Sequence, residues 1–135
     1  MAKIKILNGD ETTQKLQLSD HGHSWVPKGR RVIWKIAEDS NVASIQNIVV
    51  NRGAEIFSEL PARKKSKWKA KIAQGANDYA QCKYSIFWNA TDGTGPYEYD
   101  PKISVKPSAI SALPIIIAVV SFVSLILLFG KISKR

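Results

Sequence analysis

The chain has 135 residues, and its 20 Lys and Arg against 11 Asp and Glu give a formal net charge of +9. This length is enough for one domain whose core needs neither a disulfide nor a metal, and the single cysteine, Cys82, excludes an intrachain disulfide. The positive charge favours acidic partners such as nucleic acid or anionic lipid. The N-terminus shows no apolar signal segment, so we expect no secretion signal.

Residues 1–107 are predicted to form a β-domain. Short segments that alternate in polarity, or that are rich in β-branched and aromatic residues, are separated by Gly, Pro, Asn and Asp. No segment before residue 108 has a helical period. We therefore expect a mainly β fold, an antiparallel sandwich. The predicted strands are residues 3–7, 14–19, 30–36, 42–50, 67–73, 82–88 and 102–105.

The segment ARKKSKWKAKIA (62–73) is strongly basic. From residue 67 its lysines alternate with apolar residues, which is typical of a half-buried strand, so Trp68 should face the core. The three basic residues that follow Pro61 and Ala62 are predicted to lie in a loop. The candidate residues for contact with an anionic surface are Arg63, Lys64, Lys65, Lys67, Lys69 and Lys71.

Three interpretations of this basic segment stay open. It can be the solvated face of an ordinary strand, a contact for anionic lipid, or a nucleic-acid site. Lysine and arginine near an anionic leaflet gain on the order of 1 kcal/mol each. Nucleic acid is the least favoured partner, because readers of single strands expose aromatic side chains among their basic residues and no such module is visible here.

Candidate metal ligands occur in the segment DHGHSW (20–25). On a strand, His21 and His23 would point the same way, and two ligands need a third, either Cys82 or a carboxylate such as Asp20. The simpler interpretation is a polar turn that enters a strand, so we expect no metal and no cofactor. A Ser/His/Asp set has no supporting nucleophile motif, and no Gly-rich phosphate loop or CxxC is present, so we expect no enzyme.

Residues 109–130 read AISALPIIIAVVSFVSLILLFG, 22 residues without a charge. As a helix they would measure about 33 Å, which matches a hydrocarbon core of about 30 Å. We therefore predict a transmembrane helix over residues 108–131 and a basic tail over 132–135. A stripe of small residues could seat another helix of a membrane complex. The residues of this stripe are Ala118, Ser121 and Ser124.

The flanking charges barely distinguish the two orientations, with Lys102 and Lys106 before the span and three basic residues after it. The missing signal segment and the position of the span favour a C-terminal anchor. We expect a single-pass membrane protein whose β-domain lies in the cytoplasm.

The run SWVPKGRRVIWKI (24–36) resembles the early hairpin of cupredoxins, and CKYSIFW with DPKISV resembles the last two strands of that Greek-key sandwich. The resemblance covers most of residues 3–106 and implies a cupredoxin-like or immunoglobulin-like fold. In the family, His and Met follow the copper cysteine; here neither follows Cys82, and the upstream histidine has no counterpart between Glu38 and Val50. The resemblance therefore implies no copper. The chain also resembles small uncharacterised bacterial β-domain proteins that open with a similar KIKILNGD and carry DHGHS, and these imply no activity.

Two functions from different classes follow from the sequence. The first is a non-catalytic, membrane-anchored interaction module, which would act as an accessory subunit of a membrane protein complex. The alternative is a metal-binding or redox protein of cupredoxin-like fold that uses His21 and His23.

Overall fold

The computed structural model describes residues 1–108, so the predicted span and basic tail lie outside the described residues. Within that part of the chain no helix is long and apolar enough to cross a membrane. A single 3-10 turn, η1 (Ala54–Ile56), accompanies the strands. The strands are β1 (Ala2–Gly9), β2 (Leu16–Leu18), β3 (His23–Pro27), β4 (Arg31–Ile36), β5 (Val42–Arg52), β6 (Phe57–Lys64), β7 (Lys67–Ile72), β8 (Gln81–Ala90), β9 (Tyr97–Tyr99) and β10 (Lys102–Lys106).

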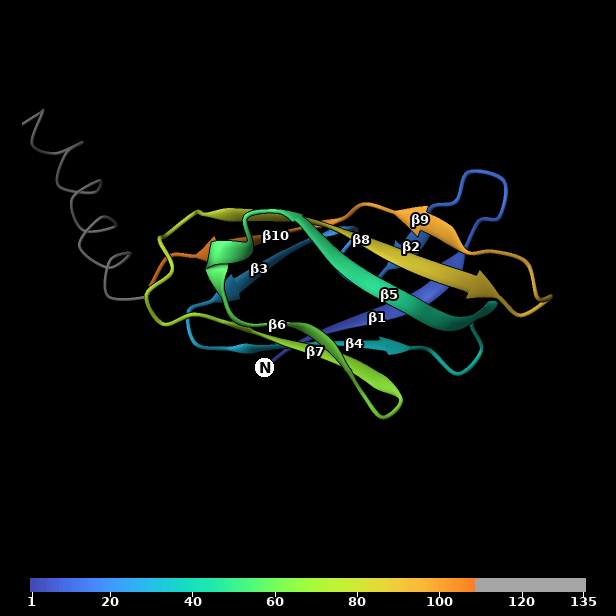
Figure 1. Ribbon diagram of the computed structural model, residues 1–135, viewed down its shortest axis with the longest axis horizontal. Helices are drawn as coiled ribbons and strands as arrows, with labels where there is room; N and C mark the ends of the chain where they lie inside the picture. Colours follow the sequence, from blue (N-terminus) through green and yellow to red (C-terminus); the bar gives the residue numbers. More distant parts are fainter. Residues whose placement is uncertain (109–135) are drawn as a thin grey trace, which may run out of the picture.

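These strands form two sheets that enclose one hydrophobic core (Figure 1). Sheet A has the order β2-β1-β4-β7-β6, and sheet B has the order β3-β10-β8-β5 with β9 paired to β8. Alternate residues of both sheets point into the core, which is why Ile4 and Ile6 are buried while Lys3 and Lys5 are exposed. The mainly β prediction is confirmed.

The core is built around large aromatic side chains. The indole N–H of Trp34 donates to the Tyr84 hydroxyl at 3.1 Å, and the two rings meet edge to face with centroids 5.5 Å apart. Trp88 is fully buried at the other end of β8, where its indole N–H donates to the Gln14 carbonyl. Both buried indole N–H groups therefore have a hydrogen-bond partner, which offsets the cost of burying them.

All seven predicted strands are present, together with β3, β6 and β9; β3 is the strand expected after the turn DHGHSW, whereas β6 and β9 were missed. The pattern of β6, FSELPARK, shows no alternation and contains Pro61, which an edge strand tolerates. Its register with β7 slips twice, so the polarity of its residues does not follow period two. The predicted loop after Pro61 is therefore wrong: Arg63 and Lys64 belong to the strand.

Both sheets are mixed, whereas a purely antiparallel sandwich was expected. β1 pairs with β4 in parallel, and β3 pairs with β10 in parallel. The expected early hairpin over residues 24–36 is also absent as a pair, because β3 lies in sheet B and β4 in sheet A. The turn between them carries the chain from one sheet to the other, so each of these strands finds its neighbours elsewhere in the sequence.

The strand directions define two ends of the domain (Figure 1). The C-terminal end of β10 leads to Ser108, and the pairings place the end of β3, the start of β4 and the β7–β8 loop beside it; we call this the chain-exit end. The β6–β7 hairpin turns at the opposite end, which we call the hairpin end. A strand rises about 3.3 Å per residue, so the six residues of β7 separate the two ends by roughly 20 Å.

Candidate functional site: the basic outer face of sheet A

The outer face of sheet A collects basic side chains from four neighbouring strands. On β7 the alternation is as predicted, because Trp68, Ala70 and Ile72 are buried in the core and the lysines between them point outward. The parallel pairing of β1 with β4 sets Lys5 beside Lys35. The antiparallel pairing of β4 with β7 sets Arg31 beside Lys71. We name as the basic face Lys3, Lys5, Arg31, Lys35, Lys64, Lys67, Lys69 and Lys71.

One apolar residue lies in the middle of this face. Ile33 points outward, since its neighbours Val32 and Trp34 belong to the core, and yet it is only 6% exposed. Its direct cross-strand neighbours are Lys3 and Lys69. The aliphatic stems of such lysines cover apolar surface while the ammonium groups stay in water. The lysines of β7 are accordingly half-buried.

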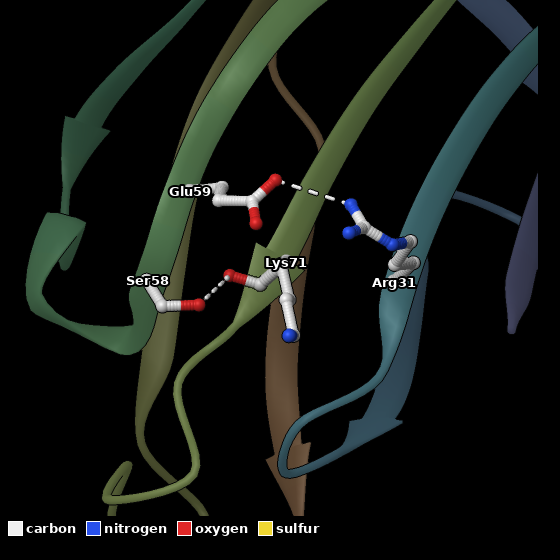
Figure 2. A network of polar contacts seen from close by, with 4 residues as sticks. All are labelled: Arg31, Ser58, Glu59 and Lys71. Carbon is white, nitrogen blue, oxygen red and sulfur yellow. Dashed lines mark hydrogen bonds and ion pairs between the residues drawn. The ribbon is translucent and has the colours of Figure 1, made fainter.

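Few acidic groups balance the basic face. Within residues 1–108 there are two ion pairs, Arg31 with Glu59 at 3.1 Å and Lys28 with Asp78 at 2.7 Å, and the second lies off this face. Figure 2 shows Glu59 reaching across β7 to Arg31, while the Lys71 ammonium points away from both. In the same view the Ser58 hydroxyl donates to the Lys71 carbonyl, so it is the backbone of Lys71 that is held.

The far corner of the face is less basic. Glu38 and Asp39 follow β4 and line a shallow hollow together with Lys5 and Lys35. The excess of positive charge is therefore greatest along β7 and the adjoining part of β4.

Arg63, a candidate for surface contact, is exposed, but its guanidinium is hydrogen-bonded within the fold. It stands opposite Trp68 in the β6–β7 register, on the core side. Its Nη2 donates to the Ile45 carbonyl of β5 at 2.8 Å, and its guanidinium carbon lies 5.8 Å from the Trp68 ring centroid. Arg63 therefore bridges the open side between the two sheets. Lys65 sits at the tip of the hairpin, with a positive φ of 59°.

The structure does not bring the candidate metal ligands together. Cys82 and Ser24 both stand opposite Ile103 and face the core, whereas His23 stands opposite Lys102 and faces outward. His21 lies in the preceding turn. Within residues 1–108, no group of three or more His, Cys, Asp and Glu residues could hold a metal ion. The polar turn that enters a strand, the simpler interpretation of DHGHSW, is what the structure has.

The histidine and acidic side chains of this segment serve local structure instead. Asp20 accepts from the Gly22 backbone N–H at 2.8 Å and from the Ser24 hydroxyl, which fixes the turn. The His23 Nε2 lies 2.7 Å from the Ser104 hydroxyl. Ser104 is fully buried, so the pair satisfies a buried hydroxyl and offers no accessible nucleophile.

Cys82 is buried, as its residue type favours. Removal from water, with a smaller contribution from the charge of Glu55, raises the pKa of its thiol to about 12. The thiol is therefore protonated at neutral pH and is a poor nucleophile and metal ligand.

The signal for the rest of the basic face was present in the sequence but lay in separate segments. KIKIL alternates basic and apolar residues as KWKAKI does, whereas RRVIWKI places its basic residues on both sides of the apolar run Val32–Trp34. Only the pairing of β1, β4 and β7 shows that these lysines share one surface. The predicted helix-packing residues, Ala118, Ser121 and Ser124, lie outside the described residues.

No protein-family model matches this chain, and no curated protein matches it either.

Proposed function

We propose that this chain is a non-catalytic interaction module, held at a membrane by residues 109–130, whose basic face binds the acidic surface of a neighbouring membrane protein. The observation that carries the proposal is the basic face itself. Eight basic side chains from four strands share it, with one ion-paired carboxylate among them. An unbalanced charged surface of this kind favours a partner of opposite sign and speeds its association.

The position of this face favours a protein partner over the lipid of the anchoring bilayer. The face runs along the strands, on the side of the domain, and the hairpin that ends it lies roughly 20 Å from the chain-exit end. Charges are screened within about 8–10 Å at physiological salt. If the chain-exit end meets the bilayer, most of the basic face points sideways, toward other proteins in the same membrane.

For the fold we propose a Greek-key sandwich of the cupredoxin type that has no copper site. In support, β8 and β10, which resemble the last two strands of that family, are adjacent and antiparallel, with Cys82 opposite Ile103. For the topology we propose a cytoplasmic β-domain and a C-terminal anchor, supported by the uncharged run that begins one residue after Ser108.

The test is extraction of the full-length protein from its membrane in mild detergent, with mass spectrometry of the proteins that migrate with it. The variant Lys3→Gln/Lys35→Gln/Lys69→Gln removes three charges and keeps the first two methylene groups of each side chain beside Ile33. The control Lys15→Gln/Arg52→Gln/Lys83→Gln removes three exposed charges outside the basic face. At about 0.5–1 kcal/mol per charge pair, the first variant should bind its partner roughly ten- to a hundredfold more weakly, and the control should bind as the wild type does.

Three outcomes would contradict the proposal. A wild-type protein that migrates alone has no stable partner. Partners that stay bound to the first variant would exclude the basic face as their site. If partners stay bound while salt-dependent association with anionic vesicles is lost, the face is a lipid site instead.

A further inference from the structure

An exposed aromatic pair lies at the chain-exit end, away from the basic face. Trp25, on the edge strand β3, is 48% exposed, and Tyr79, in the β7–β8 loop, is 61% exposed. Their ring centroids are 6.1 Å apart and the rings meet edge to face. His23 extends the cluster along β3, with its ring centroid 5.1 Å from that of Trp25. Large aromatic side chains are normally buried, so an exposed pair calls for an explanation.

The fold holds both rings in place rather than leaving them on a free loop. Tyr79 has a φ of +66°, which is uncommon for a residue of this size. Its backbone N–H donates to the Val105 carbonyl at 2.8 Å, and the Val105 N–H donates to the carbonyl of the next residue, Ala80, at 2.8 Å. The ion pair between Lys28 and Asp78 ties the same loop to the β3–β4 turn. The structure thus maintains an unfavourable backbone conformation that points an aromatic ring into water.

The pair sits beside the point where the chain leaves the domain. Val105, which holds Tyr79, is four residues before residue 109, the first of the uncharged run. Four extended residues reach at most about 14 Å. Tryptophan and tyrosine are the residues enriched at the headgroup level of membranes, where the ring meets apolar groups and the N–H or O–H stays hydrated. The exposed side chain of Lys106 lies at the same end and can reach headgroup phosphates.

We propose that Trp25 and Tyr79 form the edge on which the β-domain rests in the headgroup layer of the bilayer that residues 109–130 span. The inference rests on the proposed membrane anchor and adds the orientation of the domain on it. The contact depends on amphipathic rings and not on net charge, so zwitterionic phospholipid is a sufficient partner. In this orientation the strands extend away from the membrane, and the basic face is free to bind a protein partner.

Trp25 can report on this contact directly. The chain has four tryptophans, and the other three, Trp34, Trp68 and Trp88, are buried in the core. The full-length protein is reconstituted into phosphatidylcholine vesicles, with or without lipids brominated near the carbonyl end of their acyl chains, since bromine quenches indole emission on contact. The conservative variant Trp25→Phe gives the emission of the buried tryptophans alone. Flotation of the vesicles and resistance to alkaline extraction report separately on the anchor.

We expect shallow bromine to remove most of the emission that the Trp25→Phe substitution removes, and to leave the emission of the variant nearly unchanged. If the protein floats with the vesicles and resists alkali but Trp25 escapes quenching, the aromatic edge does not rest on the bilayer, although the anchor stands. If alkali strips the protein from the vesicles, the anchor fails, and the proposed orientation fails with it. A Trp25 that is quenched only when anionic lipid is present would overturn the claim that the contact needs no charge.

Discussion

The chain-exit end of the β-domain carries exposed aromatic residues, whereas the hairpin end carries Lys64 and Lys65. The distance of these residues from residue 109 along the sequence does not predict which of them lie near it in the fold. Lys64 and Lys65 are nearer in sequence to the hydrophobic run than Trp25 is, but they turn at the hairpin end. Trp25 comes from the first quarter of the chain and lies at the chain-exit end, because β3 pairs in parallel with β10. A basic segment that precedes a predicted span therefore need not lie near the membrane along its whole length, since Lys71 is beside Arg31 at the chain-exit end while Lys64 is not. The pairing of strands decides which residues do.

The largest expected change in the free energy of unfolding comes from substituting a glycine, and the cost should differ between the two ends of the domain. Gly53 has a φ of +82°, and a Cβ there would lie 2.0 Å from the Gln81 carbonyl oxygen. Gly93 has a similar φ of +88°, and a Cβ there would meet nothing within 4 Å. Gly53→Ala should lower the free energy of unfolding by about 3 kcal/mol or more, because backbone strain and overpacking add. Gly93→Ala should cost about 1 kcal/mol, from the strain alone.

The measurement is urea unfolding of the full-length variants in detergent, with tryptophan emission as the signal that monitors unfolding. Equal losses in the two variants would mean that the close approach of Gly53 to β8 does not exist in solution.

The second effect is a loss of folding stability at alkaline pH. It is caused by two buried groups in the half of β8 next to the chain-exit end. Burial raises the pKa of Cys82 to about 12 and also raises that of Tyr84. Each group gives up its proton more readily in the unfolded chain than in the folded one. The stability that Cys82 contributes is therefore complete below about pH 9, and that of Tyr84 below about pH 10; above these values each contribution falls by roughly 1.4 kcal/mol per pH unit. Cys82→Ala should make this decline shallower between pH 9 and 12.

Two carboxylates at the hairpin end, Asp10 and Asp92, have pKa values shifted in the opposite direction. Hydrogen bonds from the backbone of Thr13 and Thr12 lower the pKa of Asp10, and those from the hydroxyl and backbone of Thr94 lower the pKa of Asp92. Their contribution is complete above the ordinary carboxyl pKa of about 4 and is lost as the pH falls below it. Urea unfolding across the pH range measures both limbs. A Cys82→Ala variant with an unchanged alkaline slope would contradict the burial of the thiol.

The smallest expected effect is a difference in stability between substitutions at two neighbouring basic residues of the hairpin end, Arg63 and Lys64. Arg63→Gln removes the hydrogen bond to the Ile45 carbonyl and the contact with Trp68, and it should cost about 1 kcal/mol of stability. Lys64→Gln changes an exposed side chain and should stay within about 0.5 kcal/mol of the wild type. For partner binding the order reverses, since Lys64 lies on the basic face and Arg63 does not. Thermal unfolding and partner capture on the same two variants test this reversal.

The alternation of residues within one segment predicted which side chains of that segment are buried. The alternation of KWKAKI predicted that Trp68 is buried, and it is, in the core cluster. β6 was missed because its two register slips and Pro61 erase the period that strand prediction uses. The mixed sheets could not be predicted either, because Lys3 meets Ile33 only through a pairing between segments about 30 residues apart in the sequence. The six candidate basic residues therefore divided: four lie on the basic face, Lys65 lies at the tip of the hairpin, and the exposed Arg63 is hydrogen-bonded to the Ile45 carbonyl beside Trp68.

The place of β10 in sheet B has a consequence for the order of assembly. It is the last strand of the domain, and it lies between β3 and β8, with Ser24 on one side and Cys82 on the other. Until residues 102–106 leave the ribosome, sheet B consists of two separate pieces, and the fully buried Ile103 and Val105 are absent from its core. Such long-range closure is slow compared with local pairing. If residues 109–130 form the proposed anchor, the last strand of sheet B and the anchor would leave the ribosome within a few residues of each other, so that sheet B closes only as the anchor is being made.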